Sequence, residues 1–246
     1  MTFGYLIIGI LAIILGQIVS HLNLKMPPVV SEEITYKVFF KNLRNDFKLD
    51  FKYSLILLII FEAIMHFVGN SYISYIYAIL VAILMIVFSI DYRFQLIPDE
   101  AHAVIILLGI INLIMNISLW YSYVIGMAIG AGIFYALSLL AVVIFKKEGM
   151  GFGDVKLMGA LGFLFGIKSI LVITLLSFFI GAIIGGLLLI LNKKKADSYM
   201  PFGPFIVIAT IIIIFVNPND VIELYIGLCT WLSMGMTDLV FKLTNK

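Results

Sequence analysis

Two aspartates stand out in this mostly apolar chain because each lies at the edge of a long hydrophobic run. Asp91 follows the apolar run 72–90, and Asp154 comes directly after the glycine-rich stretch 149–153. Charges are costly at the edge of a membrane span, so those found there usually have a function. Two carboxylates within a few ångströms of each other share a proton rather than both ionise. Such a pair can activate water and protonate a developing oxyanion, as in an aspartic protease.

The stretch before Asp154 predicts a tightly folded or mobile loop that leads into a helix. Its glycines, at positions 149, 151 and 153, permit positive φ angles and close backbone approach. Asp154 would then lie at a helix N-terminus, where the helix dipole favours an anion. The alternative is that Asp154 only caps this helix, and the stretch by itself leaves that alternative open.

Composition places the chain in a membrane. Of its 246 residues 63% are hydrophobic and only 12% are charged, and the mean hydropathy is +1.17. Its apolar runs reach the roughly 17–25 residues that a helix needs to cross a bilayer. We therefore predict an all-α, polytopic integral membrane protein with eight or nine transmembrane segments in a single membrane-embedded domain over 1–246. The single cysteine excludes an internal disulfide and a cysteine-rich metal site.

Basic residues predict the orientation. Six lysines and arginines lie in the polar segment 22–52, which we expect to be a short cytoplasmic loop in contact with anionic lipid. With the N-terminus outside, every lysine and arginine except Lys168 falls on the cytoplasmic side of the cell membrane. Asp91 and Asp154 then lie on the same inner face, so the two carboxylates can meet.

Glycines four residues apart occur in two of the apolar runs. Gly126 and Gly130 have this spacing, as do Gly181 and Gly185. Spacing of this kind is more typical of close helix packing than of a ligand site.

Several motifs resemble those of one family. The stretch 151–156, Gly-Phe-Gly-Asp-Val-Lys, is similar to the GxGDxK motif of the type IV prepilin peptidases. The stretch 91–99 looks like that family's first catalytic aspartate followed by its Ile-Pro-Asp turn, and Pro-Phe-Gly-Pro at 201–204 also resembles a family segment. The end of the first helix, 16–27, is loosely similar. The ordered combination spreads over most of the chain.

The resemblance implies a membrane-embedded aspartic endopeptidase. Such enzymes remove the short basic leader from prepilins, or from pilin-like secretion and competence proteins, at the cytoplasmic face. The expected partners are a prepilin-like precursor and membrane lipid, with no nucleic acid. By this resemblance Asp91 and Asp154 form the catalytic pair. The supporting residues are Gly151, Gly153, Lys156, Pro98 and Asp99.

The residues themselves leave the supporting roles open. Asp99 follows Pro98 in the same inner loop, where a solvated turn or a helix cap is the simpler interpretation. Lys156 would steer an anionic group of the substrate or neutralise the carboxylate site.

The sequence departs from the family pattern in the loop 22–52. Many bacterial members have paired CxxC motifs there and also methylate the new N-terminus with S-adenosylmethionine. This loop has no cysteine, which excludes a zinc site of that kind. We expect no metal and no cofactor for proteolysis, and methylation stays open.

Two alternatives to a peptidase fit the same carboxylates. A proton- or cation-coupled secondary transporter also uses intramembrane acids and short, broken helices. Inverted repeats would favour it, and the sequence has none that we recognise. The second alternative is a scaffold without activity, in which the acids only cap helices. Neither the oligomeric state nor the precursor follows from the sequence.

Overall fold

The computed structural model describes residues 2–25, 51–146, 150–191 and 201–244, and almost all of these are helical. The predicted all-α class is confirmed. Most of the predicted loop 22–52 lies outside the described residues, and the two flanking helices extend into its ends. The helices are α1 (Thr2–Lys25), α3 (Phe51–Phe67), α4 (Tyr72–Phe94), α5 (Asp99–Met115), α6 (Trp120–Phe145), α7 (Phe152–Phe165), α8 (Ile167–Ile190), α9 (Gly203–Phe215) and α10 (Pro218–Thr244), with a 3₁₀ turn at Ile117–Leu119.

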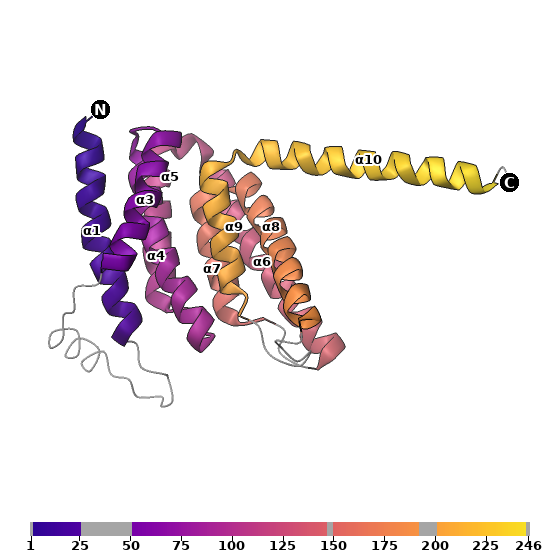
Figure 1. The fold of residues 1–246 in the computed structure, drawn as a ribbon, viewed down its shortest axis with the longest axis horizontal. Coiled ribbons are helices and arrows are strands. Elements are labelled where there is room, and N and C mark those ends of the chain that lie inside the picture. Colours follow the sequence, from indigo (N-terminus) through magenta and orange to yellow (C-terminus); the bar gives the residue numbers. More distant parts are fainter. Residues whose placement is uncertain (1, 26–50, 147–149, 192–200, 245–246) are drawn as a thin grey trace.

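Helices α1 and α3 to α9 stand side by side and alternate in direction (Figure 1). As a result, the C-terminus of α4 lies at the same end of the bundle as the N-termini of α5, α7 and α9. We call this the site end, because it holds Asp91 and Asp154. Helix α10 leaves from the opposite end and projects sideways from the bundle (Figure 1). The axis of α9 and the first part of α10 differ by 104°.

The predicted number of spans, eight or nine, is wrong when helix length and hydropathy are the criterion. Four helical segments in the described residues are long and apolar enough to cross a membrane: Gly4–His21, Tyr72–Phe94, Ile117–Ile144 and Ile167–Leu188. A fifth is added if the bent pair α9 and α10 counts as one span. Helices α7 and α9 have 14 and 13 residues, which gives a length of roughly 20 Å against a hydrocarbon core of roughly 30 Å.

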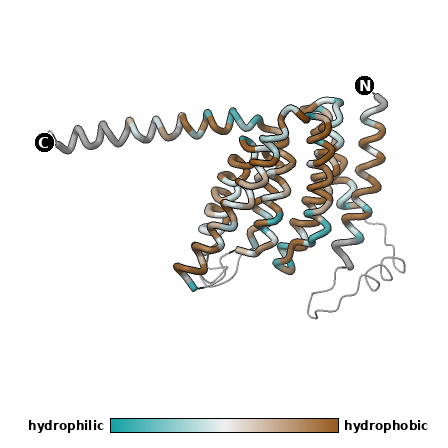
Figure 2. The backbone as a smooth tube through the Cα atoms, turned by 180° about the vertical axis from the view of Figure 1, so that it is seen from behind, coloured by the Kyte–Doolittle hydropathy of each residue, from teal (hydrophilic) through white to brown (hydrophobic). Residues whose placement is uncertain are grey.

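The bundle presents apolar side chains outward as well as inward. Apolar colour follows the helices of the bundle, while hydrophilic colour gathers mostly near their ends (Figure 2). Large side chains such as Ile59 on α3, Ile114 on α5 and Val143 on α6 are exposed. This surface suits a bilayer, where lipid tails take the place of water.

Small residues let the helices approach closely. A Cβ atom on Gly126 of α6 would lie 2.5 Å from the carbonyl oxygen of Gly162 on α7. A Cβ on Gly162 would in turn lie 2.6 Å from the carbonyl carbon of Gly126, and one on Gly130 would meet the Met158 carbonyl. The packing interpretation of Gly126 and Gly130 is confirmed. This contact fixes α7, which carries Asp154, against the longer helix α6.

We expect Gly162→Ala to destabilise the folded protein by about 1–3 kcal/mol, because the added methyl group meets backbone that cannot rotate away. Unfolding by heat or SDS in detergent would measure the loss. The matched control is Gly132→Ala on α6, where the added Cβ has no neighbour within 4 Å. This substitution should leave the stability unchanged or raise it slightly. Equal stability of the two variants would contradict the expected contact.

The short helix α7 is held at its C-terminus by a side chain of α5. The Asn112 amide donates a hydrogen bond of 3.0 Å to the Leu164 carbonyl, one of the last carbonyls of the helix. Such carbonyls have no partner within their own helix and are costly to leave unpaired in a membrane. Gly166 then takes a positive φ of 78°, which allows the chain to turn directly into α8. The contact explains how α7 can end inside the bundle.

Candidate functional site

Asp91 is buried in the last turn of α4, with 5% of its surface exposed. The helix ends at Phe94, and Gln95 closes it in the left-handed conformation with a hydrogen bond of 2.9 Å to the Asp91 carbonyl. The carboxylate oxygen Oδ2 accepts a hydrogen bond of 2.9 Å from the backbone N–H of Gly203. The first residue of α9 therefore fixes the direction of the Asp91 side chain.

Gly203 is held in place by an aromatic cluster at the start of α9. The ring of Phe202 lies 5.1 Å from that of Phe178 and 5.7 Å from those of Phe134 and Phe205. A Cβ atom on Gly203 would lie only 2.6 Å from Asp91 Oδ2. The stretch 201–204 resembles a family segment, but its sequence alone does not mark it as part of the site. That stretch was the signal that could have identified Gly203.

Asp154 is buried in the first turn of α7, with 4% of its surface exposed. The backbone of Gly151, the residue that caps α7, lies next to its carboxylate, as expected for an aspartate in the first turn of a helix. Among the described residues, Oδ1 of this carboxylate has no hydrogen-bond partner. The negative charge of Asp91 acts on Asp154, which places the two carboxylates within electrostatic range of each other. Capping alone does not require that proximity.

Asp99 and Lys156 form an ion pair at the edge of the site. The Lys156 ammonium donates a hydrogen bond of 2.8 Å to Asp99 Oδ1 and also lies 5.4 Å from the centre of the Phe152 ring. The hydrogen bond from Lys156 lowers the pKa of Asp99, whose side chain is 75% exposed. Pro98 precedes α5 in an extended conformation. Lys156 thus contacts Asp99 across the first turns of α5 and α7.

His102 and Gly153 make a second contact between α5 and α7. The ring nitrogen Nε2 of His102 lies 3.1 Å from the Gly153 carbonyl oxygen, and the side chain is buried. A Cβ on Gly153 would lie 3.2 Å from Cβ of Ile97, so only glycine fits without displacing its neighbour. Sequence reasoning assigned no role to His102, because a histidine at a span end has no pattern that marks it.

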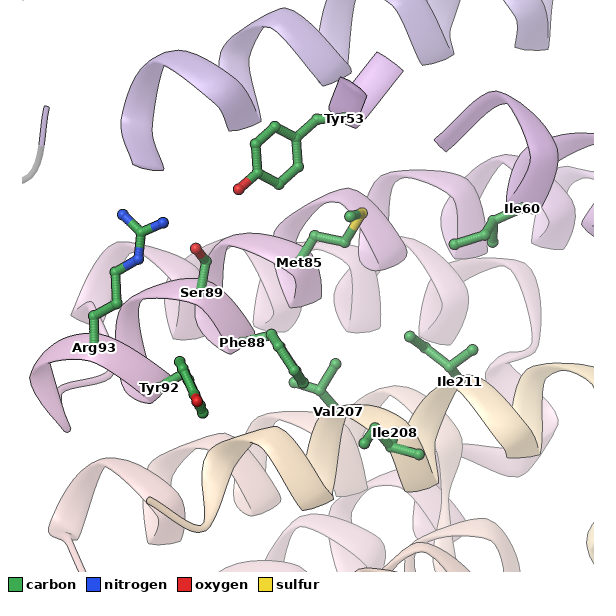
Figure 3. Close-up of a pocket in the computed structure, with 10 residues that line it drawn as sticks. All are labelled: Tyr53, Ile60, Met85, Phe88, Ser89, Tyr92, Arg93, Val207, Ile208 and Ile211. Carbon is green, nitrogen blue, oxygen red and sulfur yellow. The ribbon is translucent and has the colours of Figure 1, made fainter. Parts of the chain in front are cut away.

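A recess of about 450 Å³ lies between α3, α4 and α9 (Figure 3). Tyr53, Ser89 and Arg93 place polar groups at one end, next to the turn of α4 that carries Asp91 (Figure 3). Tyr92 adds a phenol to the lining. The other lining residues are apolar: Ile60, Met85, Phe88, Val207, Ile208 and Ile211. The recess therefore becomes less polar away from the site end.

The fold and the site together define a helical polytopic membrane protein with two buried aspartates, brought from α4 and α7 to one end of the bundle. Comparison with protein families matches residues 78–186 to the type IV leader peptidase family. Over these residues the chain is similar to that family, which confirms the resemblance to type IV prepilin peptidases. The matched segment contains Asp91, Asp154 and the residues predicted to support them, which are Pro98, Asp99, Gly151, Gly153 and Lys156.

Curated relatives agree with the family match. The chain is 33% identical over 138 residues to a prepilin leader peptidase/N-methyltransferase of Xanthomonas campestris pv. campestris, covering 56% of this chain and 48% of the relative. It is 35% identical over 141 residues to the protein of that name from Legionella pneumophila, with the same coverage of each. The Bacillus subtilis relative is 28% identical over 149 residues, covering 60% of this chain and 58% of the relative. The chain thus spans about half the length of these relatives. A search of the solved structures found no match.

Proposed function

We propose that this chain is a membrane aspartic endopeptidase that cleaves the leader from a prepilin or pilin-like precursor. The observation that carries the proposal is the burial of Asp91 and Asp154 at one end of the bundle, within electrostatic range of each other. Both lie inside the segment that matches the leader peptidase family. A buried pair of carboxylates that shares one proton is the chemistry this hydrolysis needs.

In the proposed reaction, one carboxylate takes a proton from a water molecule as its oxygen attacks the peptide carbonyl carbon. The protonated partner donates to the developing oxyanion, and the C–N bond then breaks as the leaving amine is protonated. The Gly203 N–H holds one oxygen of Asp91, whereas Asp154 Oδ1 has no partner in the described residues. No protein group among the described residues therefore competes with the attacking water or the substrate for that oxygen.

The distribution of basic residues supports a cytoplasmic orientation of the site end. In helices α1 and α3 to α9 and at their ends, five basic residues lie at the site end and Lys168 lies at the opposite end; the five are Lys25, Lys52, Arg93, Lys146 and Lys156. Positive residues next to membrane spans favour the cytoplasmic side. Water and a precursor with a cytosolic leader would then reach Asp91 and Asp154 from the cytoplasm.

The names of the relatives also include N-methyltransferase, which makes S-adenosylmethionine a candidate second substrate. The recess of about 450 Å³ is large enough for a small molecule, but none of the described residues that line it has a carboxylate or amide side chain. A carboxylate is the usual partner of ribose hydroxyls in nucleotide sites. The residues of this recess therefore do not fit the group, and we include no methylation step.

The decisive experiment is to reconstitute the protein in liposomes with a prepilin-like precursor and to follow the loss of the leader by gel electrophoresis and mass spectrometry. We expect one cleavage at the junction between the leader and the apolar segment. A proton- or cation-coupled transporter would leave the precursor intact and instead carry ions across the liposome. Absence of cleavage with intact, folded protein would overturn the proposal.

Asp99→Asn should keep most of the cleavage activity, with a loss of less than about fivefold. Its pair with Lys156 is largely exposed, and exposed ion pairs contribute at most about 1 kcal/mol. The asparagine side chain can still accept the hydrogen bond from Lys156. The rate of precursor cleavage measures the effect. If Asp99→Asn were as inactive as Asp154→Asn, then Asp99 would belong to the catalytic pair and the assignment of Asp91 would have to be revised.

A further inference from the structure

The first turns of α5 and α7 are joined by two contacts that have the same spacing on both helices. Asp99 and His102 are three residues apart on α5, and Gly153 and Lys156 are three residues apart on α7. Asp99 pairs with Lys156 at 2.8 Å, and His102 Nε2 lies 3.1 Å from the Gly153 carbonyl. Asp154 lies between the two contacts along α7. The outer contact is exposed, whereas His102 is buried with 5% of its surface accessible.

The geometry determines which nitrogen of His102 carries a proton. A carbonyl oxygen can only accept a hydrogen bond, so Nε2 of His102 must be the donor to Gly153. The other ring nitrogen, Nδ1, lies 3.4 Å from Asp99 Oδ1 and has no hydrogen-bond partner among the described residues. The bond to Gly153 is therefore the directional contact that His102 makes. Because it is buried, it is harder to replace by water than the exposed Asp99–Lys156 pair.

We propose that His102 is a positioning residue for Asp154. Its Nε2–H holds the Gly153 carbonyl and so fixes the rotation of the first turn of α7, on which the next residue is Asp154. Gly153 allows this approach because it has no side chain to meet Ile97. A small rotation of this turn would change the direction of the Asp154 carboxylate relative to Asp91. Hydrolysis depends on that direction, since displacements of about 1 Å can cost about a hundredfold in rate.

This inference rests on the proposed peptidase function, and it makes a specific demand on the kinetics. Loss of the His102 hydrogen bond should lower kcat by about tenfold or more and leave KM within about twofold, because the substrate need not touch His102. If His102 only stabilised the fold, replacing it would instead lower the amount of active protein. A substituted side chain that keeps the hydrogen-bond donor would then not restore the rate.

Three substitutions separate the hydrogen bond from the packing. In His102→Gln the amide nitrogen can occupy nearly the position of Nε2 and donate to Gly153, so we expect kcat within about threefold of wild type. In His102→Asn the side chain is one methylene shorter and cannot reach, and in His102→Leu the donor is absent. Both should lose about tenfold. The matched control is His66 on α3, which is exposed and should tolerate both glutamine and leucine without effect.

A second measurement does not depend on catalysis. Hydrogen–deuterium exchange of the backbone amides in residues 151–158 should be faster in His102→Asn than in wild type, with His102→Gln close to wild type. If His102→Leu fails to fold, the comparison of the glutamine and asparagine variants decides. Equal kcat and equal exchange for these two variants would overturn the positioning role. If the wild type cleaves no precursor, the proposed function is wrong, and the exchange measurement alone still tests the contact.

Discussion

Replacing either Asp91 or Asp154 by asparagine is expected to abolish precursor cleavage, with a fall in kcat of at least about a thousandfold. An asparagine has nearly the same shape as an aspartate, but it can neither take a proton from water nor give one to an oxyanion. Both side chains are buried, so neither change adds an exposed apolar surface. The folded protein should persist, because each substitution also replaces one ionisable group of a buried carboxylate pair, where a charge is costly, by a neutral amide. Cleavage rates in liposomes and thermal unfolding in detergent measure the two effects.

The double variant distinguishes a working pair from two independent residues. Groups that act as a unit have strongly non-additive effects, so Asp91→Asn combined with Asp154→Asn should be no less active than either single variant. Asp99→Asn is the matched control, since it lies between them in the sequence but its side chain is exposed. Measurable turnover by one of the single variants would mean that the remaining aspartate acts with another group, and the proposed pair would be incorrect.

The sequence predicted the class of the fold and the two aspartates because both depend on local composition. Apolar runs determine where helices form in a membrane, and a carboxylate at the end of such a run is rare enough to be noticed. Whether Asp91 and Asp154 meet is a tertiary property, and the alternating directions of the helices bring them to the same end (Figure 1). Their catalytic role remains a proposal.

The number of spans could not be predicted because several apolar runs form short helices. Helix α7 ends at Phe165 because Gly166 turns the chain and Asn112 satisfies a carbonyl from another helix, and neither effect is visible in a hydropathy pattern. Helix α9 likewise ends at Phe215, and the chain then bends by 104° into α10. The predicted last span, about 221–241, falls in α10, which the structure directs away from the bundle (Figure 1).

The residues that orient the carboxylates were missed for a related reason. Gly203 contacts Asp91 across 112 positions of sequence through its backbone N–H, which every residue except proline possesses. His102 contacts the carbonyl of Gly153, again a group that carries no sequence signature. Backbone groups that act on side chains from distant helices are recognised only when the helices are placed together.

We expect Gly203→Ala to separate activity from stability. The new methyl group would lie 2.6 Å from Asp91 Oδ2, too close for any stable contact, so the carboxylate must rotate away and lose its hydrogen bond from residue 203. A side-chain terminus moves at little cost, and alanine is a better helix former than glycine. The melting temperature should therefore change little, while kcat falls by about tenfold to a hundredfold because Asp91 no longer points at the substrate. Cleavage kinetics and thermal unfolding of the same preparation provide both quantities.

Gly132→Ala is the matched control for this experiment, because it adds the same methyl group to a helix at a position where nothing lies within 4 Å of the added Cβ atom. It should keep wild-type kcat and stability. A Gly203→Ala protein with wild-type kcat would mean that the direction of Asp91 set by α9 is irrelevant to hydrolysis. Loss of stability together with kcat would mean instead that the start of α9 is rigidly packed by the Phe202 cluster and that the methyl group displaces the helix. Only a fall in kcat at constant stability is consistent with Gly203 acting through the orientation of one carboxylate.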